Sequence, residues 1–120
     1  MENECVFCKI VRGEIPSGKG KIYEDDDFIS VLDINPVGEG HATVISKKHF
    51  QLLEELDEET FSKYLKVISK VGKILKEKYN SNGFNVVLND GKAAGQVIPH
   101  IHFHLLPRNE GDNKRGIFLG

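Results

Sequence analysis

The sequence predicts an α+β fold, an antiparallel sheet of about five strands with one long helix and one or two short helices packed against it. Two observations carry this prediction. Short apolar segments recur between turn residues, as expected for strands, and one long segment carries apolar residues at helical spacing. A length of 120 residues with 39% hydrophobic residues suits one domain over residues 1–120.

The N-terminal half of the chain predicts a short helix and three strands. Phe7, Ile10 and Val11 have helical spacing, and Gly13 ends that helix. Strands are expected over residues 21–23, 28–32 and 42–45, the first two joined by an acidic turn. A loop containing Gly, Asn and Pro over residues 33–40 separates the second strand from the third.

The C-terminal half predicts the long helix and two further strands. Asp57 can cap the N-terminus of the helix, and the two glutamates that follow it suit the first turn. One apolar stripe along the helix is assigned to core packing and consists of Phe61, Tyr64, Leu65, Ile68, Val71, Leu75 and Tyr79. The turn residues 80–83 end the helix, and strands are expected over residues 84–88 and 100–106.

The overall charge and hydropathy exclude several classes of partner. A net charge of −2 predicts no nucleic-acid partner, because nothing draws the whole molecule toward a polyanion. No apolar stretch approaches the roughly 20 residues that a membrane-spanning helix needs, so no membrane association is expected. The acidic N-terminus lacks the basic start and apolar core of a secretory signal, which predicts a cytoplasmic or a nuclear protein.

Three of the five histidines alternate with apolar residues in the run His-Ile-His-Phe-His-Leu-Leu over residues 100–106. In a strand, His100, His102 and His104 share one face while the intervening side chains point into a core. A plain strand would use Val or Ile at these positions, and burying three imidazoles is costly unless they do chemistry. We therefore favour a reactive site over a solvated strand face that is rich in histidine.

A turn of small and polar residues, Asn-Asp-Gly-Lys-Ala-Ala-Gly-Gln over residues 89–96, lies directly ahead of the histidines. Main-chain N–H groups in such a turn can approach an anion closely. Beside imidazoles that are nucleophilic at neutral pH, this turn predicts phosphoryl or nucleotidyl transfer. The competing interpretation is a three-histidine zinc site, which is less favoured because alternate residues of a strand lie about 7 Å apart.

Both cysteines lie in the motif Cys5-Val6-Phe7-Cys8. This spacing suits a tetrahedral zinc ion but supplies only two of its four ligands. A redox motif is disfavoured by its place near the N-terminus, and a third interpretation is that both thiols are small buried apolar groups.

The histidine run resembles the signature of the histidine triad (HIT) family, and further segments occur in family order at 5–10, 32–36, 40–41, 47–49, 89–91, 94–96 and 106–108. Over nearly its whole length the chain is similar to the compact Hint-type members. This resemblance implies a HIT-like fold, a homodimer, and a purine nucleotide such as AMP as ligand, with no organic cofactor.

The resemblance also implies roles for single residues. The catalytic residues would be His102, His104 and His41. His102 would be the nucleophile that forms a nucleotidyl-histidine intermediate, and His41 would orient the triad. Nine positions correspond to nucleotide-binding residues. Phe7, Ile10 and Leu32 lie around the base, Asp33 lies at the ribose, and Asn89, Gly95, Gln96 and His104 lie at the phosphate, together with the nucleophile His102. In zinc-bearing relatives the ligands correspond to Cys5, Cys8, His49 and His100, so a structural zinc is expected.

Together these features predict a hydrolase that cleaves purine nucleoside phosphoramidates. Two alternatives stay open. One is a dinucleoside polyphosphate hydrolase of the Fhit-like kind, because the segment around Arg108 also resembles that branch and its guanidinium can meet extra phosphate charge. The other is a nucleotide-binding interaction protein whose hydrolysis is incidental.

Overall fold

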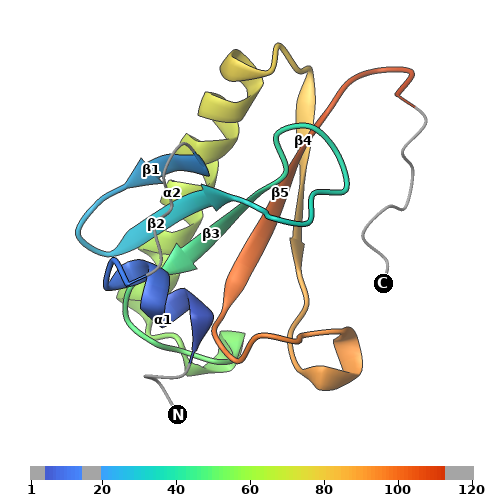
Figure 1. Cartoon of the computed structure of the whole chain (residues 1–120). Helices are drawn as coiled ribbons and strands as arrows, with labels where there is room; N and C mark the ends of the chain where they lie inside the picture. Colours follow the sequence, from blue (N-terminus) through green and yellow to red (C-terminus); the bar gives the residue numbers. More distant parts are fainter. Residues whose placement is uncertain (1–4, 15–19, 113–120) are drawn as a thin grey trace.

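A computed structural model describes residues 5–14 and 20–112 and has at its centre a five-stranded antiparallel sheet in the order β1-β2-β3-β5-β4 (Figure 1). The strands are β1 (Lys21–Glu24), β2 (Phe28–Leu32), β3 (Ala42–Ser46), β4 (Gly83–Leu88) and β5 (His102–Arg108). Helix α2 (Glu58–Lys78) crosses behind the sheet and helix α1 (Val6–Val11) lies in front of it (Figure 1). The predicted α+β architecture is therefore confirmed.

Alternation along the strands sends apolar side chains into two cores, one on each face of the sheet. The core on the α2 face consists of Phe28, Ala42, Val44, Phe50, Tyr64, Val67, Ile68, Val71, Leu75, Ile101 and Leu105. The smaller core on the α1 face consists of Cys5, Phe7, Cys8, Ile29, Val31 and Ile45. Because β3 is covered on both faces, all five of its residues are buried.

The last strand begins two residues later than predicted. His100 and Ile101 precede β5, because the N–H of Ile101 donates to the carbonyl of Phe50 at 2.7 Å instead of joining the sheet. The strand then runs on through Pro107 to Arg108, paired with β4 alone at that end. Proline is tolerated there because β3 no longer pairs with β5 beyond Leu105, so no sheet hydrogen bond is lost.

Helix α2 begins where predicted, since the side chain of Asp57 accepts a hydrogen bond from the N–H of Thr60 at 2.7 Å. The predicted stripe is wrong at one edge, where Phe61 and Leu65 are 41% and 52% exposed. Val67 is buried in their place, because the helix is rotated so that this edge extends past the sheet.

Short elements complete the described chain. Helix α1 has Cys5 as its N-cap and ends before Gly13, whose φ of +79° suits glycine. Two 3-10 turns were not predicted: η3 (Leu53–Glu55) precedes α2, and η4 (Lys92–Ala94) precedes β5. In residues 5–14 and 20–112, no helix is long and apolar enough to cross a membrane.

Candidate active site

A cavity of about 280 Å³ lies on the α1 face of the sheet, between α1, the loop after β2 and the turn that precedes β5. All nine residues predicted to contact a nucleotide line it, namely Phe7, Ile10, Leu32, Asp33, Asn89, Gly95, Gln96, His102 and His104. Seven further residues complete the wall, which sequence reasoning did not select: Val6, Val31, Ile34, Asn35, Thr43, Val97 and Ile98. Sequence reasoning passed over these seven because most are ordinary apolar or polar residues that carry no chemistry of their own.

His102 is held in one tautomer by its own strand. Its Nδ1 lies 2.8 Å from the carbonyl oxygen of His100, and a carbonyl can only accept, so Nδ1 carries the ring proton. The lone pair is therefore on Nε2. Burial lowers the pKa of His102, against the raising effects of the carbonyl contact and of Asp33, so the ring is neutral near pH 7. A neutral imidazole with its lone pair fixed on Nε2 is suited to act as a nucleophile.

His104 and His41 form a second pair beside the nucleophile. Nε2 of His41 lies 3.0 Å from Nδ1 of His104, and the ring centres of His102 and His104 are 5.0 Å apart. One carboxylate oxygen of Asp33 lies 3.6 Å from the His41 nitrogen and 3.8 Å from the His104 nitrogen. His41 lies immediately before β3 and is buried.

Desolvation dominates the ionisation of this pair. Burial lowers the pKa of His104 to about 4, helped by the neighbouring His102 and His41 and opposed by Asp33. Burial also lowers the pKa of His41, again opposed by Asp33. Both rings are therefore neutral at pH 7, and each holds one proton whose position is set by its hydrogen-bond partners.

The turn ahead of β5 is fastened by the side chain of Gln96. Its oxygen accepts from the N–H of Gly91 at 2.8 Å, and its amide nitrogen donates to the carbonyls of Gln51 and Ile98 at 3.0 Å each. Gly95 has a φ of +96°, which lets the chain reverse here. The Gln96 side chain therefore holds the turn in shape, and its amide nitrogen donates to main-chain carbonyls.

Two main-chain donors follow that turn and border the cavity. Val97 and Ile98 both line it, and their N–H groups donate to no acceptor in the described part of the chain. Adjacent N–H groups at such a position suit the oxygens of a phosphate. Sequence reasoning placed anion-binding amides in this turn but did not single out these two.

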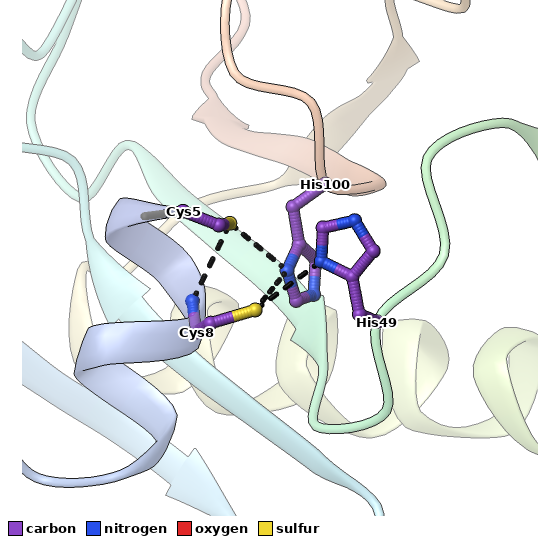
Figure 2. A group of neighbouring side chains, drawn as sticks. All are labelled: Cys5, Cys8, His49 and His100. Atoms are coloured by element: carbon purple, nitrogen blue, oxygen red, sulfur yellow. Dashed lines mark hydrogen bonds between the residues drawn. The ribbon is translucent and has the colours of Figure 1, made fainter. Parts of the chain in front are cut away.

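His100 is not among the residues that line the cavity, and its ring lies against the two cysteines (Figure 2). Its Nδ1 lies 3.3 Å from Sγ of Cys5 and 3.4 Å from Sγ of Cys8, and Nδ1 of His49 lies 3.2 Å from Sγ of Cys8. His100 Nε2 donates to the carbonyl of Ser46 at 2.7 Å, so its Nδ1 lone pair points at the sulfurs. The three imidazoles lie on the α1 face, as expected, because Ile101, Phe103 and Leu105 pack into the α2-face core. Only His102 and His104 line the cavity, whereas His100 contacts the cysteines.

The geometry of this cluster fits a metal ion. The four ligand atoms of Cys5, Cys8, His49 and His100 all lie within 4.8 Å of one another, and three of the four residues are buried. A tetrahedral zinc with bonds of roughly 2.0 Å to nitrogen and 2.3 Å to sulfur separates neighbouring ligand atoms by about 3.5 Å, close to the distances seen here. Four protein ligands would leave no open position, which is typical of a structural site.

The chain is similar to known proteins over most of its length. A model of the HIT domain matches residues 12–111. Adenosine 5'-monophosphoramidase HNT1 of Candida albicans is 40% identical over 120 residues, covering 97% of this chain and 76% of that protein. Adenylylsulfatase HINT3 of Arabidopsis thaliana is 41% identical over 112 residues, covering 93% of this chain and 56% of that protein.

A solved structure carries the same fold. The zinc-bound histidine triad family protein from Mycobacterium smegmatis superposes with a TM-score of 0.86 at 39% identity, covering 94% of this chain and 81% of that one. Fold, signature and site geometry thus agree with the family resemblance of the sequence. The chain belongs to the histidine triad family of HIT-domain proteins.

Proposed function

We propose that this protein is a nucleotide hydrolase that cleaves AMP-type phosphoramidates through a covalent intermediate on His102. The observation that carries the proposal is the contact of His102 Nδ1 with the carbonyl of His100, which leaves the Nε2 lone pair as the nucleophile. Relatives named adenosine 5'-monophosphoramidase and adenylylsulfatase support a nucleotide as the substrate.

The reaction would run in two displacements at phosphorus. In the first, Nε2 of His102 forms a bond to the α-phosphorus, the phosphorus–nitrogen bond breaks, and the amine leaves with that electron pair and takes up one proton. In the second, water adds to phosphorus, the bond to His102 breaks, and the lone pair returns to Nε2. The water releases one proton, which balances the proton that the amine took up, and the products are the amine and AMP.

The cavity walls would hold the nucleotide in place for this attack. The main-chain N–H groups of Val97 and Ile98 would meet the phosphate oxygens, whose charge increases toward the transition state. Phe7, Ile10 and Leu32 would enclose the base, and the carboxylate of Asp33 would accept hydrogen bonds from ribose hydroxyls. Asn89 would add a side-chain contact to the phosphate.

The charge of the cavity favours an amine over a polyphosphate as the leaving group. Among the described residues that line the cavity there is no Lys and no Arg. Arg108, the cation that the Fhit-like alternative needs, instead donates two hydrogen bonds to Asp112 at 2.7 and 2.8 Å and one to Asn85. A leaving group with several negative charges would therefore find no positive partner here.

The metal cluster, by which we mean the four side chains of Cys5, Cys8, His49 and His100, would support this site from behind. We propose zinc, held by Cys5, Cys8, His49 and His100, because two thiolates and two imidazoles form a donor set that zinc prefers. Bound there, the ion would supply structure, by tying α1 to the residues that precede β5.

A homodimer is proposed on the basis of one edge of the sheet. Strand β4 is an edge strand, and Val86 on it is 45% exposed although its neighbours Phe84 and Leu88 pack against the α2-face core. Phe61 and Leu65 of α2 are exposed as well. Pairing two copies along β4 would cover an unpaired edge together with these apolar side chains.

The proposed function is tested by His102→Ala in the full-length protein, assayed on an adenosine phosphoramidate with AMP binding measured beside it. We expect turnover to fall by at least a thousand-fold while the Kd for AMP changes only a few-fold, because the nucleophile is lost and the walls remain. Glu54→Ala, on the exposed turn η3, is the matched control and should keep full turnover.

A second comparison separates the alternatives. The specificity constant for a phosphoramidate should exceed that for a diadenosine polyphosphate, and the reverse order would favour the Fhit-like interpretation. Substantial turnover by His102→Ala would disprove the role of His102. Negligible turnover by the wild-type protein on every nucleotide tested would instead favour an interaction protein.

A further inference from the structure

A main-chain group in the loop between β2 and β3 contacts the buried pair of histidines. The N–H of Val37 donates to Nδ1 of His41 across 3.2 Å. A main-chain N–H can only donate, so this nitrogen must hold a lone pair. The single proton of the neutral His41 ring is therefore on Nε2.

The same argument fixes the proton of the His104 ring. Nε2 of His41 lies 3.0 Å from Nδ1 of His104, so the proton on His41 is donated to a nitrogen of His104 that must itself carry a lone pair. The proton of His104 is then on its own Nε2. His104 lines the cavity, so the tautomer of this ring decides whether the bound ligand meets a donor or an acceptor.

The contact with Val37 excludes the reverse arrangement of protons. With His104 donating from Nδ1 to His41, the proton of His41 would move to its Nδ1 and face the N–H of Val37, two donors 3.2 Å apart. Asp33 does not choose between the two arrangements. Its carboxylate oxygen lies 3.6 Å from the His41 nitrogen and 3.8 Å from the His104 nitrogen, and both distances are too long for a hydrogen bond.

We propose that the main-chain N–H of Val37 is a positioning group that selects the tautomer of His41 and thereby presents an Nε2–H donor of His104 to the phosphate. The reason that the donor matters is chemical, because phosphate oxygens accept hydrogen bonds and repel a second lone pair. The contact with phosphate rests on the proposed function, whereas the two tautomers rest on the geometry alone.

The loop is built to keep this N–H in place. Its two ends are joined by a hydrogen bond from the N–H of Asp33 to the carbonyl of His41 at 2.9 Å. Gly40, with a φ of +79°, packs so closely that a Cβ would lie 2.7 Å from the ring of Tyr79 and 2.9 Å from Pro107. The close packing of Gly40 and the hydrogen bond between Asp33 and His41 restrict how far the Val37 amide can move.

An amide-to-ester exchange at position 37 tests the proposal directly. The residue becomes 2-hydroxy-3-methylbutanoic acid, which keeps the valine side chain and removes only the N–H. The ¹⁵N chemical shifts of labelled histidine rings then report which nitrogen of His104 carries the proton, with His104→Gln used to assign the signals. An ester at Leu56, whose N–H donates to Leu53 at 3.1 Å in turn η3, controls for the exchange itself.

We expect the wild-type protein to show His104 protonated on Nε2, and the Val37 ester to show a mixture of both tautomers. The Kd for AMP should rise about ten-fold in the ester, which corresponds to one hydrogen bond with a charged partner. The Leu56 ester and Val37→Ala, which both retain the Val37 N–H, should match the wild-type protein in both measurements. Val37 is 43% exposed, so loss of its side chain is tolerated.

Three results would overturn part or all of this inference. A wild-type His104 protonated on Nδ1, or an ester whose histidine signals do not change, would disprove the selection of the tautomer by Val37. A change of tautomer without a change in AMP affinity would disprove the contact between His104 and phosphate. Failure of the wild-type protein to bind any nucleotide would refute the proposed function, while the ring signals would still decide the tautomers.

Discussion

The ring of Phe7 stands edge-on to the ring of His102, with the ring centres 4.7 Å apart and the planes at 70°. Phe7 also meets His100 edge-on at 5.9 Å, so one side chain of α1 contacts both the proposed nucleophile and a residue of the metal cluster. The same helix supplies Cys5 and Cys8 to that cluster and Phe7 and Ile10 to the cavity. The metal cluster and the cavity therefore share one short helix.

This relationship predicts that metal and nucleotide binding are coupled. A helix of six residues is unstable alone, so the proposed metal would help to hold Phe7 of α1 against the cavity. Cys8→Ser should lower the melting temperature by several degrees and weaken AMP binding a few-fold, and AMP should in turn tighten zinc binding. Calorimetry with and without a chelator measures both effects, and chelation should lower the melting temperature before activity is lost.

The control is the Cys8→Ser variant itself, to which a chelator should make no further difference. Equal AMP affinity in metal-loaded and chelated wild-type protein would contradict the coupling. Protein purified without a chelator, under reducing conditions, should contain zinc by elemental analysis, and its absence would count against the choice of metal.

Gly72→Ala should destabilise the protein, although alanine normally stabilises the interior of a helix by about 1 kcal/mol relative to glycine. The reason is that a Cβ at position 72 would lie 2.1 Å from the ring of Phe84 on β4, so the partly buried ring must shift or the helix and the strand must separate. We expect a net loss of about 1–3 kcal/mol in the free energy of unfolding, measured by urea denaturation. Phe84→Leu combined with Gly72→Ala should recover part of the loss, and a stabilised single variant would show that the ring moves freely.

Stability should fall as the pH is lowered from 7 to 5, and His104 should account for part of that loss. Its pKa is about 4 in the folded protein and near 6.5 in the unfolded chain. Between these values the unfolded chain binds more protons than the folded protein, so the free energy of unfolding rises with pH. The contribution of His104 to that free energy is fully present above about pH 6.5. At pH 5 the loss assigned to His104, which faces His102, His41 and Asp33, is about 2 kcal/mol.

His104→Gln removes this titration while it keeps a polar side chain that can donate. Its unfolding free energy, measured by urea denaturation in metal-loaded protein at several pH values, should depend less on pH than that of the wild type. Parallel curves for the two proteins between pH 7 and 5 would contradict the lowered pKa of His104.

The proposed dimer predicts a mass near twice 13.5 kDa in sedimentation at micromolar concentration. Leu65→Lys should shift the equilibrium toward the monomer, because it places a charge at an exposed apolar side chain that the proposed dimer would cover. Lys66→Glu reverses the charge at the next position without removing an apolar side chain, and is the control that should leave the mass unchanged. A wild-type protein that sediments as a monomer would refute the dimer.

Local patterns were enough to predict most of the fold. Asp57 caps α2 as expected because capping depends on a side chain and the N–H of a residue three positions later. The strands were found by their alternation, with ends that differ by one or two residues. Phe61 and Leu65 were misassigned because a periodic stripe gives the apolar face of a helix but not how far the sheet beneath it extends.

The sequence by itself singled out three histidines, two cysteines and a glycine-containing turn as the candidates for chemistry, because a plain strand core would carry Val or Ile in place of the histidines. The family resemblance already assigned His100 to the metal ligands and His102 and His104 to the nucleotide. Only the tertiary structure decided which ring nitrogen of each histidine carries the proton. The carbonyls of Ser46 and His100 and the N–H of Val37 fix one ring proton each, on His100, His102 and His41. Every residue but proline has these main-chain groups, so their partners are set by chain packing and leave no signal in the order of the side chains.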